Sequence, residues 1–285
     1  MIAAPSPTGP RPLPGKRRMV GLLALLLAGC SAGEPVRGGG IVSLNPCADQ
    51  LLLALVPAGR IAAISHYSQD ARASSIPLDV ARRFRATAGT AEEVIALAPD
   101  LVVATRFTPP ATRAAFARAG LKTLYLGSPT TIAASRAQIA EVAAAVGAVA
   151  RGRALDARIA QALVATRGTG ATPSALLFIG GDLANGDGTL LHEMMAHAGL
   201  RDAAADYGLA MTGRLPVETI VADPPAVILS PDAGGRTAAA RRRLLAATGA
   251  DTREEEFPRA LVNCGGPTIP TALRRLAAIR RSIGV

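Results

Sequence analysis

Short apolar segments alternate with longer segments in which apolar residues recur at helical spacing. The short segments have the length and composition of buried strands, and the longer ones have the pattern of amphipathic helices. Strands are expected at 41–44, 60–65, 101–104, 123–126, 175–179, 226–229 and 261–262. Helices are expected at 48–55, 91–97, 111–119, 189–198, 217–222, 236–247 and 271–282. This alternation predicts βαβ units around parallel sheets, and therefore an α/β fold.

The segment 132–165 differs from the rest because it contains almost no strong helix breaker. Ala, Leu, Val and Ile recur at helical spacing, with Arg, Gln and Glu between them. Gly147 and Gly152 are the two positions that can interrupt a helix here. One long helix or a pair of helices is expected, and the polar stretch 166–173 separates it from a second α/β series.

A sequence pattern from the first half of the chain recurs in the second half. Residues 92–103 and 218–229 both read Glu-x-apolar-apolar-Ala-x-x-Pro-x-apolar-apolar-apolar. In each copy a short helix begins near a Glu, Pro ends it, and a buried strand follows. Two such units about 126 residues apart predict two related lobes.

The N-terminal segment indicates export. Basic residues at 11 and 16–18 precede an apolar run at 19–27, which ends in Leu-Ala-Gly-Cys30. This order is typical of a secretory signal, and the run is shorter than the roughly 20 residues that span a bilayer. The closing residues resemble a bacterial lipobox. We therefore expect a signal peptide at 1–29, lipidation of Cys30, a flexible tether at 30–40 and a periplasmic protein anchored to a membrane.

The charge does not indicate a nucleic-acid partner. The chain carries a formal charge of +10, supplied almost entirely by Arg, but only 3% of its residues are aromatic. Because the arginines are spread along helical segments without aromatic residues between them, nucleic-acid binding is not expected. A hydrophobic content of 49% is that of a globular protein with a sizeable core.

No set of residues typical of an enzyme is present in the sequence. It has neither a Gly-x-Ser-x-Gly motif nor a P-loop. His192 and His197 stand five positions apart, so their side chains diverge by about 140° on a helix and do not form the i, i+4 pair of a zinc protease. We predict no catalytic residues and no resident metal or cofactor.

Taken together, these segments resemble the periplasmic binding proteins for cobalamin and iron–siderophore complexes. The resemblance covers 41–282 and rests on the segments 41–46 and 60–67, on both Glu-to-strand units, and on the glycine-containing loop at 186–191. It implies two Rossmann-like lobes with parallel sheets, at 41–128 and 171–285, joined by a long interdomain helix within 129–170. It also implies that Glu92 and Glu218 dock with a membrane permease dimer, although a helix-start charge is the ordinary role of such residues.

Ligand-binding candidates follow from the strand ends, because open parallel sheets bind ligands beyond the carboxyl ends of their strands. Arg106 and Arg214 can meet the carboxylate or hydroxamate oxygens of a chelate, and Tyr67 can stack on a flat ligand. The candidates are Asn45, Cys47, His66, Tyr67, Arg106, Phe107, Gly181, Asp182, Arg214, Asn263 and Cys264.

Cys47 and Cys264 leave three alternatives open. An oxidising compartment favours a disulfide between them. Two free thiolates with His66 would instead bind a soft metal directly. Buried, unpaired thiols are the third alternative.

The function expected from the sequence is therefore that of a monomeric substrate-binding protein of an ABC importer, which is not an enzyme. It would capture a ferric siderophore or a corrinoid and deliver it to an inner-membrane permease. The absence of Trp argues against a corrinoid, whereas the arginines suit an anionic ferric chelate. Direct metal binding and an exported metalloenzyme are the alternatives.

Overall fold

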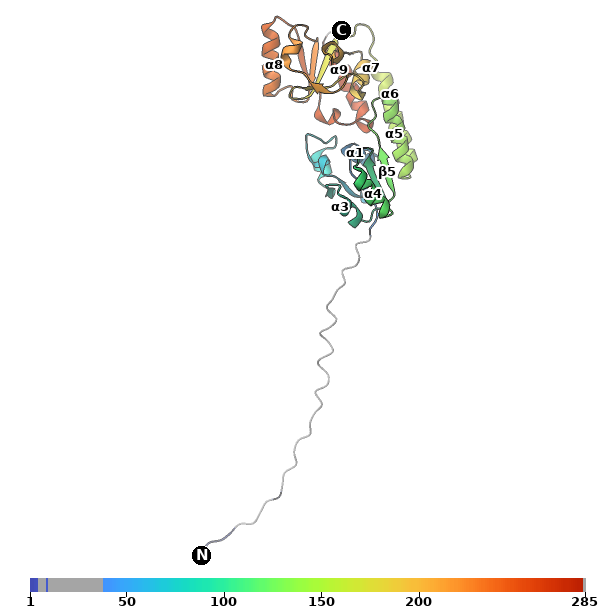
Figure 1. The fold of residues 1–285 in the computed structure, drawn as a ribbon, viewed down its shortest axis with the longest axis vertical. Coiled ribbons are helices and arrows are strands. Elements are labelled where there is room, and N and C mark those ends of the chain that lie inside the picture. Colours follow the sequence, from blue (N-terminus) through green and yellow to red (C-terminus); the bar gives the residue numbers. More distant parts are fainter. Residues whose placement is uncertain (5–8, 10–37, 284–285) are drawn as a thin grey trace. The chain divides into compact units, whose positions relative to one another are not determined.

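The computed structural model describes residues 1–4, 9 and 38–283. Residues 1–4 and 9 have no regular secondary structure. The other residues of the expected signal peptide, and the expected lipidation site Cys30, lie outside the described residues. Among the described residues, no helix combines the length and apolar composition needed to cross a membrane. Contacts divide the chain into Met1–Arg37 and Gly38–Val285, and both expected lobes belong to the second unit (Figure 1).

The N-terminal lobe contains a five-stranded sheet in the order β3-β2-β1-β4-β5, with every pair of neighbours parallel. Its central strands are apolar because helices cover both faces, so β4 is buried along most of its length. The strands are β1 (Ile41–Ser43), β2 (Ile61–Ser65), β3 (Ala86–Thr87), β4 (Leu101–Thr105) and β5 (Thr123–Leu126). The helices are α1 (Pro46–Leu55), η1 (Ala58–Arg60), η2 (His66–Gln69), α2 (Leu78–Ala81), α3 (Ala91–Ala96) and α4 (Pro110–Arg118).

The C-terminal lobe has a mixed sheet in the order β11-β10-β6-β7-β9, and β8 also pairs with β6. The expected parallel arrangement holds for β10, β11, β6 and β8, but β7 and β9 are antiparallel to their neighbours. Strand β7 runs antiparallel to β6 because the turn between them is too short for the crossover that a parallel pair needs. The strands are β6 (Ser174–Gly180), β7 (Leu183–Ala184), β8 (Arg201–Asp202), β9 (Gly213–Arg214), β10 (Val227–Ser230) and β11 (Arg253–Glu256).

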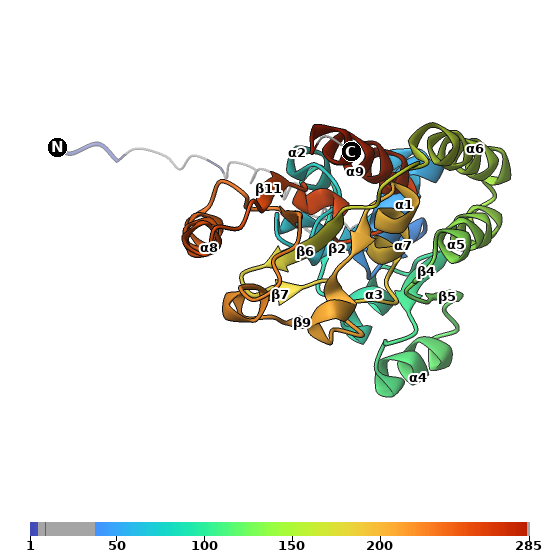
Figure 2. The same cartoon turned by 90° about the horizontal axis from the view of Figure 1, so that it is seen from above.

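Helices of this lobe cover the sheet and lead back toward its carboxyl edge. Figure 2 shows α8 on the opposite side of the molecule from α5 and α6. The helices are α7 (Leu190–His197), η3 (Ala204–Tyr207), η4 (Val217–Ile220), α8 (Arg236–Ala247), η5 (Arg259–Leu261), η6 (Gly266–Thr268) and α9 (Ile269–Ser282).

Two helices, α5 (Ile132–Ala145) and α6 (Val149–Thr166), connect the lobes. The segment is therefore a helix pair and not one long helix. Gly147 ends the first helix because it adopts a left-handed conformation with φ of 70°, which glycine tolerates best. Gly152 lies inside α6, where a Cβ would come within 2.5 Å of the Ala143 methyl group, so it allows the two helices to pack closely.

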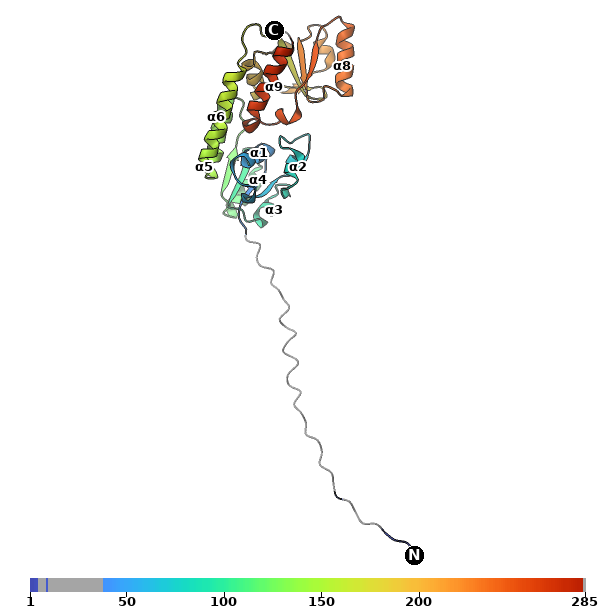
Figure 3. The ribbon, with the colours of Figure 1, turned by 180° about the vertical axis from the view of Figure 1, so that it is seen from behind.

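One continuous apolar core links the two lobes. It includes Leu52 of α1, Ile139 of α5, Ile159 of α6, Leu177 of β6 and Leu273 of α9, all at most 1% exposed. Helix α9 packs against helix α6, and Figure 3 shows both helices. Two smaller clusters cover the outer faces of the sheets. The lobes therefore share one large core, and each also has a smaller cluster of its own.

Several elements differ from the expectation. Residues 217–220 form only the 3-10 turn η4, and Leu261 ends the 3-10 turn η5 instead of beginning a strand. The short strands β3, β7, β8 and β9 were not expected. Neither was the strand β11, because its sequence Arg-Glu-Glu-Glu is charged. It pairs with β10, and its Glu254 is buried in an ion pair with Arg241 of α8, so a local charge is satisfied by a residue of another element.

Candidate functional site

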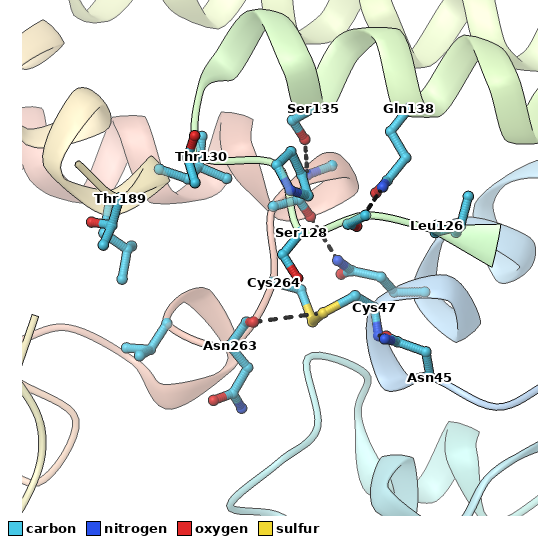
Figure 4. Close-up of a pocket in the computed structure, with 18 of the residues that line it drawn as sticks. Asn45, Cys47, Leu126, Ser128, Thr130, Ser135, Gln138, Thr189, Asn263 and Cys264 are labelled. Atoms are coloured by element: carbon cyan, nitrogen blue, oxygen red, sulfur yellow. Dashed lines mark hydrogen bonds between the residues drawn. A yellow bond between two sulfur atoms is a disulfide. The ribbon is translucent and has the colours of Figure 1, made fainter. Parts of the chain in front are cut away.

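A cavity of about 380 Å³ lies between the lobes, next to α5. Six segments line it: the start of α1, the loop after β5, the first turns of α5, the residues at 185–194 that lead into α7, Thr212 before β9, and the loop at 262–266. Figure 4 shows side chains from both lobes and from α5 around this space. Its volume is within the usual range of small-molecule sites. The two lobes together therefore form a site that neither provides alone.

The start of α1 places Cys47 at the cavity. Asn45 caps the helix, because its side-chain oxygen accepts hydrogen bonds from the backbone N–H groups of Cys47 at 2.7 Å and Ala48 at 3.4 Å. Pro46 follows as the first helical residue, where its missing N–H costs no hydrogen bond. Asn45 therefore lines the cavity and also fixes the direction of the helix.

Cys47 and Cys264 form a disulfide between the lobes, with their Cα atoms 5.4 Å apart. The disulfide is therefore the alternative, among the three, that the structure contains. The alternative metal site of two thiolates and His66 is not formed, because the sulfur atoms are bonded to each other. Within the described part of the chain, no group of three or more His, Cys, Asp or Glu side chains is arranged to hold a metal ion.

Hydrogen bonds reinforce this disulfide. Gln50 donates to the carbonyl of Gly265 at 2.6 Å, and the N–H of Gly266 donates to the Ser135 hydroxyl of α5 at 2.9 Å. Asn263 donates to the backbone carbonyl of Arg72 at 3.3 Å. The loop at 263–266 belongs to the C-terminal lobe but is bound to the N-terminal lobe and to α5. It forms a fixed wall of the cavity.

Asn45, Cys47, Asn263 and Cys264 are the predicted ligand-binding residues that the structure brings together at the cavity. His66 and Tyr67 lie in η2 and do not line it. Their rings stand 4.1 Å apart, and the His66 Nδ1 atom lies 3.2 Å from the carbonyl oxygen of Thr87.

Phe107 and Tyr67 are exposed, at 79% and 54%. They follow β4 and β2, which flank β1 in one parallel sheet, so both stand at the carboxyl edge of that sheet.

The two predicted arginines do not line the cavity. Arg214 forms an exposed ion pair with Asp182 at 2.8 Å, and the hydrogen bond from Arg214 lowers the pKa of that carboxyl group. Gly181 occupies the tight turn before Asp182, with φ of 57°. Arg106 is exposed beside Gly127, with its Nε atom 3.8 Å from the position of a Cβ on that glycine. Arg106 therefore stands close to the cavity wall, whereas Arg214 is engaged elsewhere.

The residues that sequence reasoning missed are uncharged and polar. Residues 127–130 directly follow β5, so the strand-end rule applied to that strand would have found Ser128 and Thr130. The others are Gln50, Ser135, Gln138, Asn185, Thr189 and Thr212. Of these, Asn185 follows the short strand β7, Thr212 precedes the short strand β9, and the rest stand on or at the start of helices, where no local signal separates a site residue from a surface residue.

The two histidines of α7 contact separate partners. The His192 Nδ1 atom lies 3.1 Å from a carboxylate oxygen of the buried Asp202, and the His197 Nε2 atom lies 2.8 Å from the backbone carbonyl of Leu163. Each imidazole therefore fixes α7 to a different neighbour.

Glu92 and Glu218 occupy equivalent positions in the two lobes. Both are exposed in the first turn of a short helix, α3 or η4, and within the described residues neither carboxylate has a hydrogen bond or ion pair. In contrast, the neighbouring Glu93 accepts hydrogen bonds from Thr87 and Ala88. Two residues after each Glu, Val94 and Ile220 are buried. The repeated sequence pattern therefore corresponds to a repeated structural unit.

Asp49 lies one helical turn into α1 and holds the end of β2 in place. Its Oδ2 atom accepts hydrogen bonds from the Ser65 N–H at 3.0 Å and the Ser68 hydroxyl at 2.6 Å. Burial raises the pKa of Asp49 to about 7, against hydrogen bonds that lower it. Asp49 thereby positions the segment that carries His66 and Tyr67.

Comparison with known proteins places the chain in a family. The family model described as periplasmic binding protein matches residues 41–248. This match covers most of the chain, which therefore belongs to the periplasmic binding protein family, whose members bind substrates for transport. Family membership supports a periplasmic location. No curated protein matches the sequence at a significant level.

Solved structures share the fold at low sequence identity. The apo form of the periplasmic heme-binding protein RhuT from Roseiflexus sp. RS-1 is 23% identical, with a TM-score of 0.66, covering 86% of this chain and 98% of that chain. The periplasmic heme-binding protein HutB of Vibrio cholerae is 17% identical, with a TM-score of 0.69, covering 85% and 98%. The periplasmic vitamin B12-binding protein BtuF of Vibrio cholerae is 18% identical, with a TM-score of 0.64, covering 85% and 96%. These similarities show the two-lobed fold.

Loss of the interlobe disulfide is expected to destabilise the protein. It joins residues 217 positions apart, and closing so long a loop in the unfolded chain is worth up to about 5 kcal/mol. The free energy of unfolding in urea should fall by about 2 to 5 kcal/mol when wild type is reduced or when Cys47→Ser and Cys264→Ser are combined. The double variant is the control, because reductant should not change its stability further. Equal stability of oxidised and reduced wild type would contradict the prediction.

Asp49 should make the stability depend on pH. Because its pKa is raised in the folded state, the folded protein keeps a proton that the unfolded chain releases. The free energy of unfolding should therefore fall by about 2 kcal/mol as pH rises from about 5 to 7, and it should remain level above that range. Asp49→Asn should remove this contribution in urea unfolding at pH 5, 6, 7 and 8, whereas exposed Asp251→Asn should retain it. Parallel profiles for wild type and Asp49→Asn would show that Asp49 does not titrate in this range.

Proposed function

We propose that this protein is the substrate-binding protein of an ABC importer and that it captures a metal chelate between its lobes. The observation that carries the proposal is the interlobe cavity, to which both lobes and α5 contribute side chains. Membership in the periplasmic binding protein family supports it. Three proteins with this fold are a heme-binding protein, a second heme-binding protein and a vitamin B12-binding protein, and both ligands are metal chelates.

Two exposed aromatic residues of the N-terminal lobe suit a flat chelate. Tyr67 and Phe107 stand at the carboxyl edge of the N-terminal sheet, the edge at which open α/β sheets bind ligands. In this proposal their rings contact the face of the chelate, whereas part of its periphery enters the cavity. Arg106 lies close enough to the cavity wall to contact the ligand as well, but Arg214 is already paired with Asp182.

Delivery would use one carboxylate on each lobe. Glu92 and Glu218 are exposed, free of partners among the described residues, and repeated at equivalent positions, which suits docking on a two-fold permease dimer. The proposal includes a monomeric protein held at the membrane by lipid on Cys30, which the lipobox-like sequence supports.

A ligand titration tests the proposal. Residues 31–285 would be titrated by calorimetry and thermal shift with cobalamin, heme, ferric siderophores and bare divalent metals. One chelate should stabilise the fold by about 2.7 kcal/mol at a free concentration of a hundredfold over its Kd. Stabilisation by bare metals alone, or by no member of the panel, would contradict the proposal.

Docking is tested separately from binding. Glu92→Arg and Glu218→Arg should each reduce uptake of the chelate by about tenfold or more in cells that depend on this protein, because the reversed charge repels an arginine on the permease. Chelate affinity should stay unchanged, since neither residue lines the cavity. Glu141→Arg is the matched control, an exposed Glu on α5. Uptake equal to that of the control would show that the two residues are ordinary helix-start charges.

A further inference from the structure

The interlobe cavity contains no charged side chain. None of the 23 residues that line it is Asp, Glu, Lys, Arg or His. Because 18% of the chain is Asp, Glu, Lys or Arg, about four charged residues would be expected among 23 positions. Ten of the lining residues carry a hydroxyl or a side-chain amide. The wall is therefore polar but electrically neutral.

Neutral amides supply both donors and acceptors to the cavity. Gln50 donates one N–H to the carbonyl of Gly265, and Gln138 donates one to that of Gly127 at 2.8 Å. A primary amide carries two N–H groups, so each of these two keeps a second N–H as well as an oxygen that has no donor among the described residues. Asn45 accepts at its oxygen from the backbone of α1, and its N–H groups have no hydrogen bond to the described residues. The cavity therefore presents uncharged donors and acceptors, together with hydroxyl groups, but no cation.

This arrangement discriminates between ligand groups. A carboxylate carries a negative charge, so in a lining without a cation it would lose its hydration without gaining a charged partner. A carboxamide or hydroxyl group of a ligand carries no charge and pairs with the donors and acceptors of the amides and hydroxyls. We propose that the cavity is a subsite for an uncharged, hydrogen-bonding arm of the chelate and that it disfavours a carboxylate arm. This inference rests on the proposed function, because it assumes that a chelate occupies the cleft.

The wall is held in place before a ligand arrives. The disulfide, the bond from Gln50 to Gly265 and the bond from Gly266 to Ser135 fix the loop at 263–266. Asn185 and Thr189 hydrogen-bond each other at the start of α7. A wall held by these bonds cannot easily rearrange to bring a cationic side chain to a carboxylate, so the discrimination persists in the bound state.

Arg106 is the charge that works against this inference. Its guanidinium lies next to Gly127, one residue before Ser128. If Arg106 controlled the subsite, a carboxylate arm would bind better than an amide arm, because the guanidinium donates to carboxylates. However, Arg106 is exposed and does not line the cavity. Whether the amide arm or the carboxylate arm binds more tightly therefore shows whether the neutral wall or Arg106 controls the subsite.

The test compares chelates that differ only in the charge of an arm. Cyanocobalamin would be titrated against its side-chain monocarboxylic acids, and heme against heme bis-amide, by calorimetry on residues 31–285. For the macrocycle that binds, the amide form should bind about tenfold or more tightly than the acid form. Equal or tighter binding of the acid form overturns the inference and leaves the proposed function intact. If neither macrocycle binds in any form, the inference fails, and the proposed function fails too only if ferric siderophores also do not bind.

A pair of variants locates the discrimination. Ser128 lines the cavity, is exposed, and has no hydrogen bond to the described residues, so substitutions there should fold. Ser128→Lys should shift the ratio of the two dissociation constants toward the acid form by about tenfold relative to Ser128→Met, which has a similar length and no charge. We use the ratio of the two dissociation constants because a loss of affinity that is common to both forms does not change it. An identical ratio in both variants would show that the arm does not occupy this cavity and would overturn the inference.

Discussion

Apolar side chains of α5 and α6 pack against helices of both lobes, and the orientation of the lobes depends on this packing. Leu52, Ile139, Ile159 and Leu273 belong to one cluster, so separating the lobes would expose surface that is now buried. Each square ångström exposed would cost about 25 cal/mol. The disulfide between Cys47 and Cys264 adds a covalent link at the inner end of the cleft. The cavity exists in its observed form because these two constraints hold its walls together.

The chemistry of the site follows from that rigidity. Side chains that keep the loop at 263–266 and the start of α1 in place also line the cavity, so Asn45, Gln50 and Asn263 have a structural role and face a ligand. Gln50 and Asn263 hold the loop through their N–H groups, whereas Asn45 caps α1 through its side-chain oxygen. The neutrality of the wall is therefore linked to its architecture, because amides can brace backbone carbonyls without placing a charge in a partly enclosed space. The exposed aromatic rings and Arg106 lie outside this region.

The sequence predicted the secondary structure where patterns were local. Strand β5 and helix α8 have the expected limits, and most other elements begin or end within two residues of expectation. It failed where distant residues decided the outcome. The charged strand β11 pairs with β10, and its Glu254 forms an ion pair with Arg241 of α8, which no local pattern indicates. For the site, the end of β1 correctly indicated Asn45 and Cys47. Asn263 and Cys264 also line the cavity, but the strand expected before them is the 3-10 turn η5. Arg214, selected because it precedes the expected helix at 217–222, pairs with Asp182 instead.

The sequence by itself determined the α/β class, the two related lobes and their helical connection, because hydrophobic periodicity and the breakers Gly and Pro act over a few residues. It also predicted that both cysteines lie at the cleft, one from each half of the sequence. Only the tertiary structure decided that these cysteines are bonded, that the connection bends at Gly147 into two helices, and that the cavity wall is uncharged. The physical reason is that pairing, side-chain direction and the sharing of donors depend on residues up to 217 positions apart, which local patterns do not relate.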